Sequence, residues 1–230
     1  MTGLPTVLLP GTLCDAALWD GVAVPGGARL LHSVRGGSLA EAAGRVLEAV
    51  PGERPFHLLG FSLGAIVAFE VLRLAPGRLA QLTLVSANPH LPTQGQLDGW
   101  AQHTERVRAG GFEALVETLG GSPHAQTLRD MARRVGPDVY LEQLNLLRSR
   151  PDSRPDLARF SGPLTVLVGQ DDGVTPPRLA DELGALAPQA EVIRVPGAGH
   201  YLPLDAPNSL SAVLAGPALM GNVLTGVAHA

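Results

Sequence analysis

The stretch Phe56-His57-Leu58-Leu59-Gly60-Phe61-Ser62-Leu63-Gly64-Ala65-Ile66-Val67-Ala68-Phe69-Glu70 decides the fold of this chain. Its first four residues form a short, largely apolar run, which is typical of a strand buried on both faces of a sheet. From Leu63 onward the apolar residues recur at helical spacing, so we predict a helix that reaches Leu74. The stretch therefore predicts a strand, a sharp turn at Ser62 and a helix.

The turn carries the pattern G-x-S-x-G. A serine that presents its oxygen at the top of a sheet must occupy a strained corner between strand and helix. Gly60 and Gly64 lack the Cβ atoms that would hold the two elements apart. The helix begins beside Ser62, so its free N–H groups can stabilise a developing oxyanion. Ser62 is therefore the candidate nucleophile, and the alternative is a Gly-Ser turn without chemistry, because the pentapeptide also arises by chance.

Composition limits the function classes. The chain has 230 residues, of which 45% are hydrophobic and 17% charged, as in a globular protein of one domain. All 17 basic residues are arginine, which excludes a Schiff-base lysine or a P-loop lysine. The net charge is −4 and no basic run occurs, so we do not expect nucleic acid as a partner.

Targeting features point to a cytoplasmic protein. Cys14 is the one cysteine, so no intrachain disulfide can form, and a role for it as a nucleophile is a minor alternative. The first residues lack a basic segment before an apolar one, so we predict no signal peptide. Residues 206–230 contain no Asp, Glu, Lys or Arg, but proline and glycine interrupt them. We therefore expect that segment to pack on the protein and not to span a membrane.

Before residue 88, strands alternate with helices. The predicted strands cover 6–9, 29–34, 56–59 and 79–86, and the predicted helices cover 39–50 and 63–74. Ser38 and Glu41 form a capping-box pattern at the start of the first helix. This order predicts an α/β fold, with a parallel sheet and helices on both faces.

Residues 88–160 break the alternation. Charge rises there, and helices are predicted at 96–109, 112–119, 126–135 and 137–147 without a strand between them. A crossover between parallel strands needs one helix, so we interpret 88–160 as a helical cap inserted into the core, with ordinary crossover helices as the alternative. Residues 1–87 and 161–230 then form the core domain. Its second part has predicted strands at 164–168 and 191–195 and helices at 176–187 and 206–214.

Three further candidate residues follow the strands of that second part. Asp171 and Asp172 come after the strand that ends near Gly169, and His200 comes after the next strand. The carboxyl ends of parallel strands share one edge of the sheet, and Ser62 lies at that edge too. The order Ser, Asp, His along the chain is one of the known orders of a catalytic triad.

Four motifs together carry a family resemblance. They are Leu8-Leu9-Pro10-Gly11, Gly60-Phe61-Ser62-Leu63-Gly64, Gly169-Gln170-Asp171-Asp172 followed by Thr175-Pro176-Pro177, and Gly197-Ala198-Gly199-His200. With them the chain resembles the α/β-hydrolase family over nearly its whole length. It is most similar to small serine esterase-like members with a helical cap, a group that Arg150-Pro151-Asp152-Ser153 also resembles. The resemblance implies an α/β-hydrolase fold and no cofactor.

The resemblance also implies roles for the site residues. Ser62 is the nucleophile, His200 takes and returns its proton, and Asp172 orients His200. Asp171 competes with Asp172 for the role of the acid.

The implied oxyanion donors are the backbone N–H groups of Leu63 and Thr12. Pro10 stands where the family usually has histidine, which could alter the loop that supplies the second donor.

Other polar and aromatic residues have weaker indications. Leu13, Trp19, Trp100 and Tyr201 are candidates for the wall of a substrate pocket, although each fits a core position equally well. The histidines outside the triad pattern are interpreted as exposed or hydrogen-bonded structural residues: His32, His57, His90, His103, His124 and His229. No His, Cys and carboxylate cluster has metal-ligand spacing, so we expect no metal.

These observations predict a serine hydrolase that cleaves a carboxylic ester of a small molecule through an acyl-enzyme. Thioesterase, enol-lactonase, C–C hydrolase and cofactor-free haloperoxidase activities use the same triad and stay open. The alternative from another class is a non-catalytic ligand receptor on the same fold, but a receptor would have no need of the triad pattern. The sequence sets neither the oligomeric state nor the acyl and alcohol preference.

Overall fold

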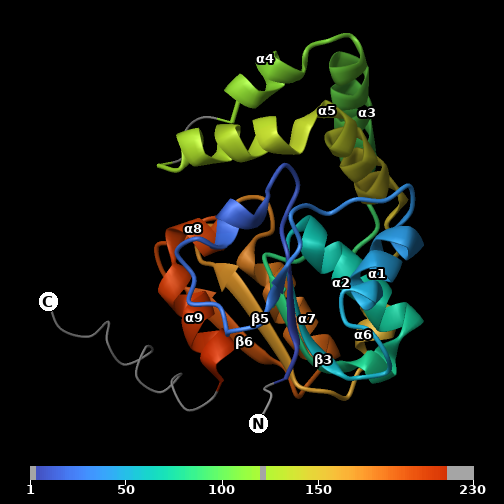
Figure 1. The fold of residues 1–230 in the computed structure, drawn as a ribbon, viewed down its shortest axis with the longest axis vertical. Helices are drawn as coiled ribbons and strands as arrows, with labels where there is room; N and C mark the ends of the chain where they lie inside the picture. The colour runs from blue at the N-terminus through green and yellow to red at the C-terminus, as the bar shows by residue number, and fades with distance from the viewer. Residues whose placement is uncertain (1–3, 120–122, 217–230) are drawn as a thin grey trace, which may run out of the picture.

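A six-stranded sheet forms the centre of the computed structural model, which describes residues 4–119 and 123–216 (Figure 1). The strands run parallel in the order β2-β1-β3-β4-β5-β6. Their bounds are Thr6–Leu9 (β1), Arg29–Leu30 (β2), Phe56–Phe61 (β3), Leu79–Val85 (β4), Leu164–Gly169 (β5) and Glu191–Val195 (β6). The predicted parallel sheet is thereby confirmed, and the carboxyl ends of all these strands meet at one edge.

Side chains of the central strands alternate between two apolar clusters, one on each face of the sheet. Leu58 and Leu84 belong to the first cluster, whereas Leu59 and Val85 belong to the second. All six residues of β3 are buried, as expected for a strand covered on both faces. Register pairs Phe61 of β3 with Val85 of β4, so these two strands end level with one another.

Helices cover both faces. The first face carries α1 (Leu39–Glu48), α2 (Leu63–Leu74) and α7 (Pro177–Leu186). The second carries the short 3₁₀ helix η1 (Ala16–Trp19), α8 (Leu202–Asp205) and α9 (Pro207–Ala215). Two short helices connect elements, η2 (Pro76–Arg78) and α6 (Arg154–Leu157).

The start of α1 follows the predicted capping pattern in one half. The side chain of Ser38 accepts a hydrogen bond from the backbone N–H of Glu41. The carboxylate of Glu41 accepts from the N–H of Gly37 instead of that of Ser38. Both contacts satisfy N–H groups near the helix start that have no partner within the helix.

A separate layer of helices lies above the carboxyl edge of the sheet (Figure 1). It consists of α3 (Gln94–Arg108), α4 (Phe112–Glu117) and α5 (Ala125–Ser149). Within α5 the backbone breaks at Gly136, which has a φ of 80° that favours glycine, so two helical segments meet there. This break separates the two helices that the sequence predicts at 126–135 and 137–147.

The second strand is shorter than its sequence predicts. We expected a strand over 29–34, but β2 ends at Leu30. The N–H of Leu31 still donates to Leu8 of β1. Further on, the C=O of Val34 accepts a hydrogen bond from the side chain of Gln143 on α5. The chain therefore leaves the sheet edge because its backbone finds partners on the upper helices.

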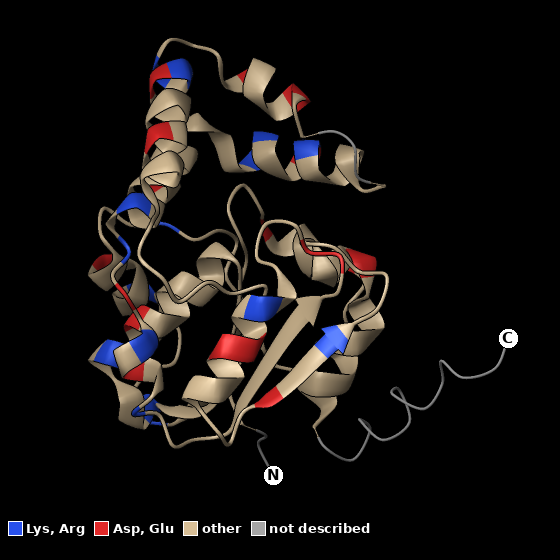
Figure 2. Ribbon diagram, turned by 180° about the vertical axis from the view of Figure 1, so that it is seen from behind, with Lys and Arg blue, Asp and Glu red and all other residues tan. Residues whose placement is uncertain are grey.

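Charged residues concentrate on the helices (Figure 2). Strand β5 has none, whereas the edge strand β6 carries Glu191 and Arg194. Among the helices of the described residues, none is both long and apolar enough to cross a membrane. The predicted helix at 206–214 is present as α9, and the rest of the uncharged segment, residues 217–230 with His229, lies outside the described residues.

Candidate active site

Ser62 occupies the corner between β3 and α2. Its backbone has φ 54° and ψ −110°, a conformation that non-glycine residues seldom adopt and that is characteristic of strained functional corners. Two glycines allow the corner to close. A Cβ on Gly60 would lie 2.4 Å from the backbone oxygen of Gly64, and a Cβ on Gly64 would lie 2.3 Å from that of Leu9. Strand and helix can therefore approach closely only because neither position has a side chain.

A continuous chain of hydrogen-bonding atoms runs from Ser62 through His200 to Asp172. Nε2 of His200 lies 3.2 Å from Oγ of Ser62, and its Nδ1 lies 2.9 Å from Oδ2 of Asp172. Ser86, directly after β4, donates from its Oγ to the C=O of His200 and so fixes the loop that carries the imidazole. The structure thus brings together the three residues that the sequence singles out.

Asp172 is almost fully buried and its carboxylate has several donors. Oδ1 accepts from the backbone N–H groups of Val174 and Thr175, each at 2.8 Å. Oδ2 accepts from the hydroxyl of Thr175 at 2.6 Å. Burial opposes ionisation, but the contacts with His200 and Thr175 outweigh it and lower the pKa of Asp172 to about 2. The group is therefore ionised at neutral pH and can hold the imidazole in one tautomer.

Asp171 lies apart from this arrangement. Its side chain is exposed, and the contact with the His200 loop is through its backbone N–H, which donates to the C=O of Ala198. No hydrogen bond joins its carboxylate to His200 within the described residues. The geometry therefore favours Asp172 over its neighbour.

Two backbone N–H groups near Ser62, those of Thr12 and Leu63, have no acceptor among the described residues. The N–H of Leu63 belongs to the first turn of α2, where no partner exists within the helix. The next N–H after Thr12, that of Leu13, donates to the side chain of Gln143 at 2.9 Å. Leu13 also has a positive φ of 57°. The N–H of Thr12, in contrast, has no acceptor among the described residues.

Ser62 and His200 face a cavity of about 370 Å³. Its wall combines residues of the core with residues of the helical layer above the sheet. Those from the core are Thr12, Leu13, Phe61, Ser62, Ile66, Ser86, Val174, Thr175, His200 and Tyr201, and Asn88 lies in the connection that follows β4. Those from residues 94–150 are Gln96, Trp100, His103, Leu119, Tyr140, Leu144, Leu147 and Arg150. The helices above the sheet therefore contribute directly to the space in front of the serine.

Three of the four proposed wall residues, Leu13, Trp100 and Tyr201, do line this cavity. Trp19 does not, and its candidacy was wrong. Its indole is 2% exposed and packs in the apolar cluster between the sheet and the helices of the second face. A tryptophan in the turn after β1 could have faced either way, and η1 rotates it inward.

Sequence reasoning missed His103 and Tyr140 as wall residues. The Nδ1 of His103 lies 2.7 Å from the hydroxyl of Tyr140. Burial raises the pKa of Tyr140 to about 12 and lowers the pKa of His103, so both are neutral at neutral pH. Their positions on α3 and α5 carry no motif, so no signal in the sequence could have placed them beside Ser62.

The other histidines have structural surroundings. His57 is buried and its Nε2 lies 2.8 Å from the hydroxyl of Thr83, whereas His32 is exposed. His90 contacts Glu182 at 2.7 Å, and His124 contacts Asp205 at 3.0 Å. Within the described residues, no three His, Cys, Asp or Glu side chains come close enough together to hold a metal ion.

Cys14 is buried beneath the loop that follows β1. Burial raises the pKa of its thiol to about 12, and a thiol in that state is a poor nucleophile. Its Sγ contacts the C=O of Thr12 at 3.4 Å. The thiol therefore packs as a small apolar group, and the serine is the better nucleophile.

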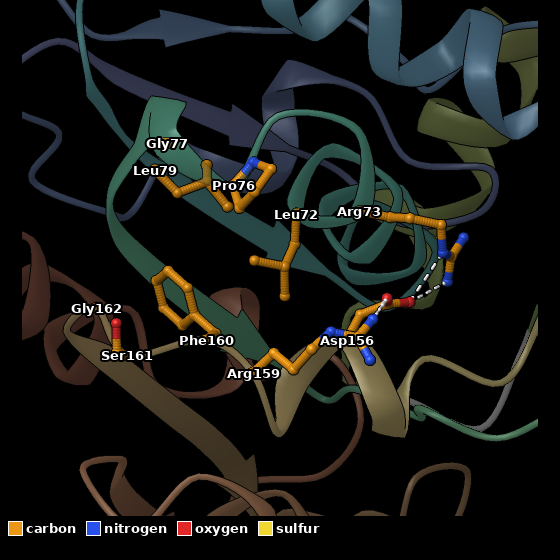
Figure 3. Close-up of a pocket in the computed structure, with 10 residues that line it drawn as sticks. All are labelled: Leu72, Arg73, Pro76, Gly77, Leu79, Asp156, Arg159, Phe160, Ser161 and Gly162. Carbon is orange, nitrogen blue, oxygen red and sulfur yellow. Dashed lines mark hydrogen bonds and ion pairs between the residues drawn. The ribbon is translucent and has the colours of Figure 1, made fainter.

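A second cavity, of about 540 Å³, lies at the amino ends of β4 and β5 (Figure 3). Arg73 points toward Asp156 there, and the two form an ion pair at 2.7 Å. Leu72, Pro76 and Phe160 supply apolar surface. This cavity is larger than the one in front of Ser62, but none of Ser62, Asp172 and His200 lines it. It is therefore separate from the candidate active site.

Comparisons with known proteins agree with the fold. A model of the alpha/beta hydrolase family matches residues 7–213. The pimeloyl-[acyl-carrier protein] methyl ester esterase of Methylococcus capsulatus is 34% identical over 179 residues, covering 71% of this chain and 69% of that protein. Two solved structures have TM-scores of 0.79. One is an esterase from Thermogutta terrifontis, which is 23% identical, with the match covering 93% of this chain and 89% of that one. The other is the enol-lactonase from Burkholderia xenovorans, which is 14% identical, with the match covering 93% of this chain and 91% of that one. Since the family model spans most of the sequence, the chain belongs to the alpha/beta hydrolase family.

Proposed function

We propose that this protein is a serine esterase that cleaves a carboxylic ester of a small molecule through an acyl-enzyme. The observation that carries the proposal is the chain of contacts from Ser62 through His200 to Asp172. Ser62 and His200 line a cavity, and two unpaired N–H groups lie beside the serine. The curated relative from Methylococcus capsulatus is itself named as a methyl ester esterase, which supports an ester as the substrate.

Acylation would use each of these groups. Oγ of Ser62 attacks the ester carbonyl carbon while Nε2 of His200 takes the hydroxyl proton. The N–H groups of Thr12 and Leu63 bind the oxyanion of the tetrahedral intermediate. When the intermediate collapses, the bond to the alkoxy oxygen breaks and His200 gives the proton to the departing alcohol. Ionised Asp172 stabilises the imidazolium that exists between these two transfers.

Deacylation repeats the sequence with water. Nε2 of His200 removes a proton from the water that attacks the acyl carbon, and the same oxyanion donors serve again. Collapse releases the carboxylic acid, and the proton returns from His200 to Ser62. These steps are complete without a cofactor, since protein groups supply the nucleophile, the base and the oxyanion donors.

We propose that residues 88–160 act as the cap of this esterase. Trp100 on α3 and Leu144 and Leu147 on α5 give the cavity an apolar wall, which suits the alkyl part of an ester. The single cysteine is buried and unpaired, in keeping with the reducing cytoplasm in which we propose that the enzyme works.

Substitution of the nucleophile tests the proposal. Ser62→Ala removes the attacking oxygen, so hydrolysis of short p-nitrophenyl esters should fall by about three to six orders of magnitude in kcat. A fluorophosphonate probe should label the wild type and fail to label the variant. Circular dichroism and the melting temperature verify that the variant folds. Undiminished ester hydrolysis by folded Ser62→Ala would refute the proposal.

A further inference from the structure

The wall of the catalytic cavity has an unbalanced charge. Among the described residues that line it, Arg150 is the one with a permanent charge, and no aspartate or glutamate is present. Arg150 follows the last residue of α5 and is 5% exposed, so water reaches it poorly. Asp172 does not compensate for it, because that carboxylate lies behind His200 and Thr175 and is not part of the cavity wall.

Contacts within the protein use part of the guanidinium group. Nε donates to the C=O of His90 at 2.8 Å, and Nη2 donates to the side-chain oxygen of Gln96 at 3.0 Å. The ring of Trp100 covers one face, with the guanidinium carbon 5.3 Å from the ring centroid. A guanidinium has five N–H donors. The described residues therefore hold one edge of the group and leave the donors of Nη1 and the second one of Nη2 without an acceptor.

Two other arginines, one on the helical layer and one on the core, have acidic partners. Arg134 on α5 pairs with buried Asp15, and Arg73 on α2 pairs with Asp156. Arg150 has no carboxylate partner within the described residues. Burial lowers its pKa to about 10, so the side chain is still charged at neutral pH. A buried cation without a counter-ion is costly, and an anion that enters the cavity would relieve that cost.

We propose that Arg150 is a carboxylate-binding subsite of the catalytic cavity, so that the preferred substrates are esters that carry one free carboxylate in addition to the ester group. The inference rests on the proposed esterase function and names its substrate class. The two terminal nitrogens of a guanidinium match the two oxygens of a carboxylate, and this charged pair strengthens where water is excluded. Trp100, His90 and Gln96 would fix the plane in which the pair forms, while the apolar wall receives the carbon chain.

A matched substrate series tests the subsite. One arm uses monomethyl esters of straight-chain dicarboxylic acids of increasing length, and a second uses acetyl esters of hydroxy acids. Each substrate is paired with an analogue in which a carboxamide replaces the free carboxylate, so size and polarity stay similar while the charge is lost. For the wild type we expect kcat/KM for the best carboxylate substrate to exceed that of its carboxamide by about 10- to 100-fold.

Variants separate recognition from a structural role. Arg150→Met should abolish the preference for the carboxylate, and Arg150→Lys should keep part of it. Arg108→Gln is the control, because it removes an exposed cap arginine that does not line the cavity and should keep the full preference. A wild type without preference in either arm, or an Arg150→Met variant that keeps it, would overturn the subsite. The wild-type ratio decides the matter if Arg150→Met fails to fold.

The two proposals fail in different ways. Equal hydrolysis of charged and neutral esters counts against the subsite and leaves the esterase standing. A wild type that hydrolyses neither kind counts against the esterase. In that case titration calorimetry with free dicarboxylates still tests the subsite, which predicts binding by the wild type and by Arg108→Gln and at least about tenfold weaker binding by Arg150→Met. Equal affinity of wild type and Arg150→Met would refute it.

Discussion

Asp171 and Asp172 are neighbours in the sequence, but their carboxylates lie in different surroundings. Asp172 is buried, accepts hydrogen bonds from Val174 and Thr175 and reaches His200, whereas the side chain of Asp171 is exposed. The loop after β5 turns at this point, and the N–H of Asp172 donates back to the C=O of Gly169. That turn determines which of the two acids faces the histidine.

This difference predicts unequal effects of removing the two charges. Asp172→Asn should lower kcat for ester hydrolysis by about 10³- to 10⁴-fold, because an amide can hold His200 in the wrong tautomer and cannot stabilise the imidazolium. Asp171→Asn should stay within about threefold of the wild type. Steady-state kinetics of both variants, with thermal melts as a check on folding, measure the ranking. A greater loss in Asp171→Asn would reassign the acid.

Residues at strand ends are predictable in a way that wall residues are not. Ser62, Asp172 and His200 follow parallel strands, and the rule that such strands end at one edge places them together without any knowledge of packing. Arg150 and Tyr140 lie on the helical layer, whose position over that edge depends on contacts between segments far apart in sequence. No periodicity or motif encodes those contacts, so the acyl and alcohol preference stays beyond the reach of sequence reasoning.

At the scale of elements, α5 is tied to the loops at the carboxyl edge of the sheet. Gln143 is fully buried, accepts from the N–H of Leu13 at 2.9 Å and donates to the C=O of Val34 at 3.0 Å. Arg134, before the break at Gly136, pairs with Asp15 in the same loop as Leu13. The helix therefore holds the loop that presents the N–H of Thr12, which connects the proposed cap with the proposed oxyanion site.

The tie through Gln143 should affect turnover more than substrate affinity. Gln143→Leu leaves the N–H of Leu13 buried without a partner and frees the loop to shift. We expect kcat for neutral esters to fall about 10- to 100-fold with a smaller change in KM, because oxyanion donors act mainly in the transition state. Stopped or continuous assays on p-nitrophenyl esters provide both constants.

Asn145→Ala is the matched control for that substitution. Asn145 is exposed on the same helix, and its side chain donates to the C=O of Gly37, so its loss also removes a tie between α5 and the core. It does not contact the Leu13 loop, and kcat should remain close to that of the wild type. Equal kcat values for Gln143→Leu and Asn145→Ala would show that Gln143 acts only on the stability of the cap.

Elements differ in how far the sequence determines them. Helix α2 and strand β3 follow their predicted bounds closely, because an unbroken apolar pattern and two glycines leave few alternatives. Strand β2 is two residues long although six were predicted. Its backbone lies at the sheet edge, and Gln143 on a distant helix competes for the C=O of Val34. Edge elements depend on such long-range partners, and a local pattern does not contain them.

For the molecule as a whole, the parallel sheet is the rigid part on which the site is assembled. Both of its faces are packed with aliphatic side chains, and the strands β3, β4 and β5 place Ser62, Ser86 and the Asp172 loop side by side. The α/β-hydrolase fold was predictable because each βα unit carries its own signature. The buried part of this sheet also contains a polar pair, formed by His57 of β3 and Thr83 of β4.

That pair predicts how global stability depends on pH. Burial lowers the pKa of His57 to about 4, while an unfolded chain holds histidine near its ordinary value of 6.5. Between these values the unfolded state binds a proton that the folded state excludes, so stability is full above pH 6.5 and is lost as the pH falls toward 4. The loss in free energy of unfolding should be about 3 kcal/mol. Asp172, with a pKa lowered to about 2, would add its own loss only at still lower pH.

Urea titrations at a series of pH values measure how steeply the free energy of unfolding changes with pH. His57→Gln keeps a side chain that can hydrogen-bond to Thr83 but cannot take up a proton, so its stability should vary much less between pH 6.5 and 4 than that of the wild type. The comparison concerns the slope, so a uniform loss of stability in the variant does not obscure it. His32→Gln replaces an exposed histidine and should retain the wild-type slope. If His57→Gln loses stability on acidification as steeply as the wild type, other buried groups control the acid response of the fold.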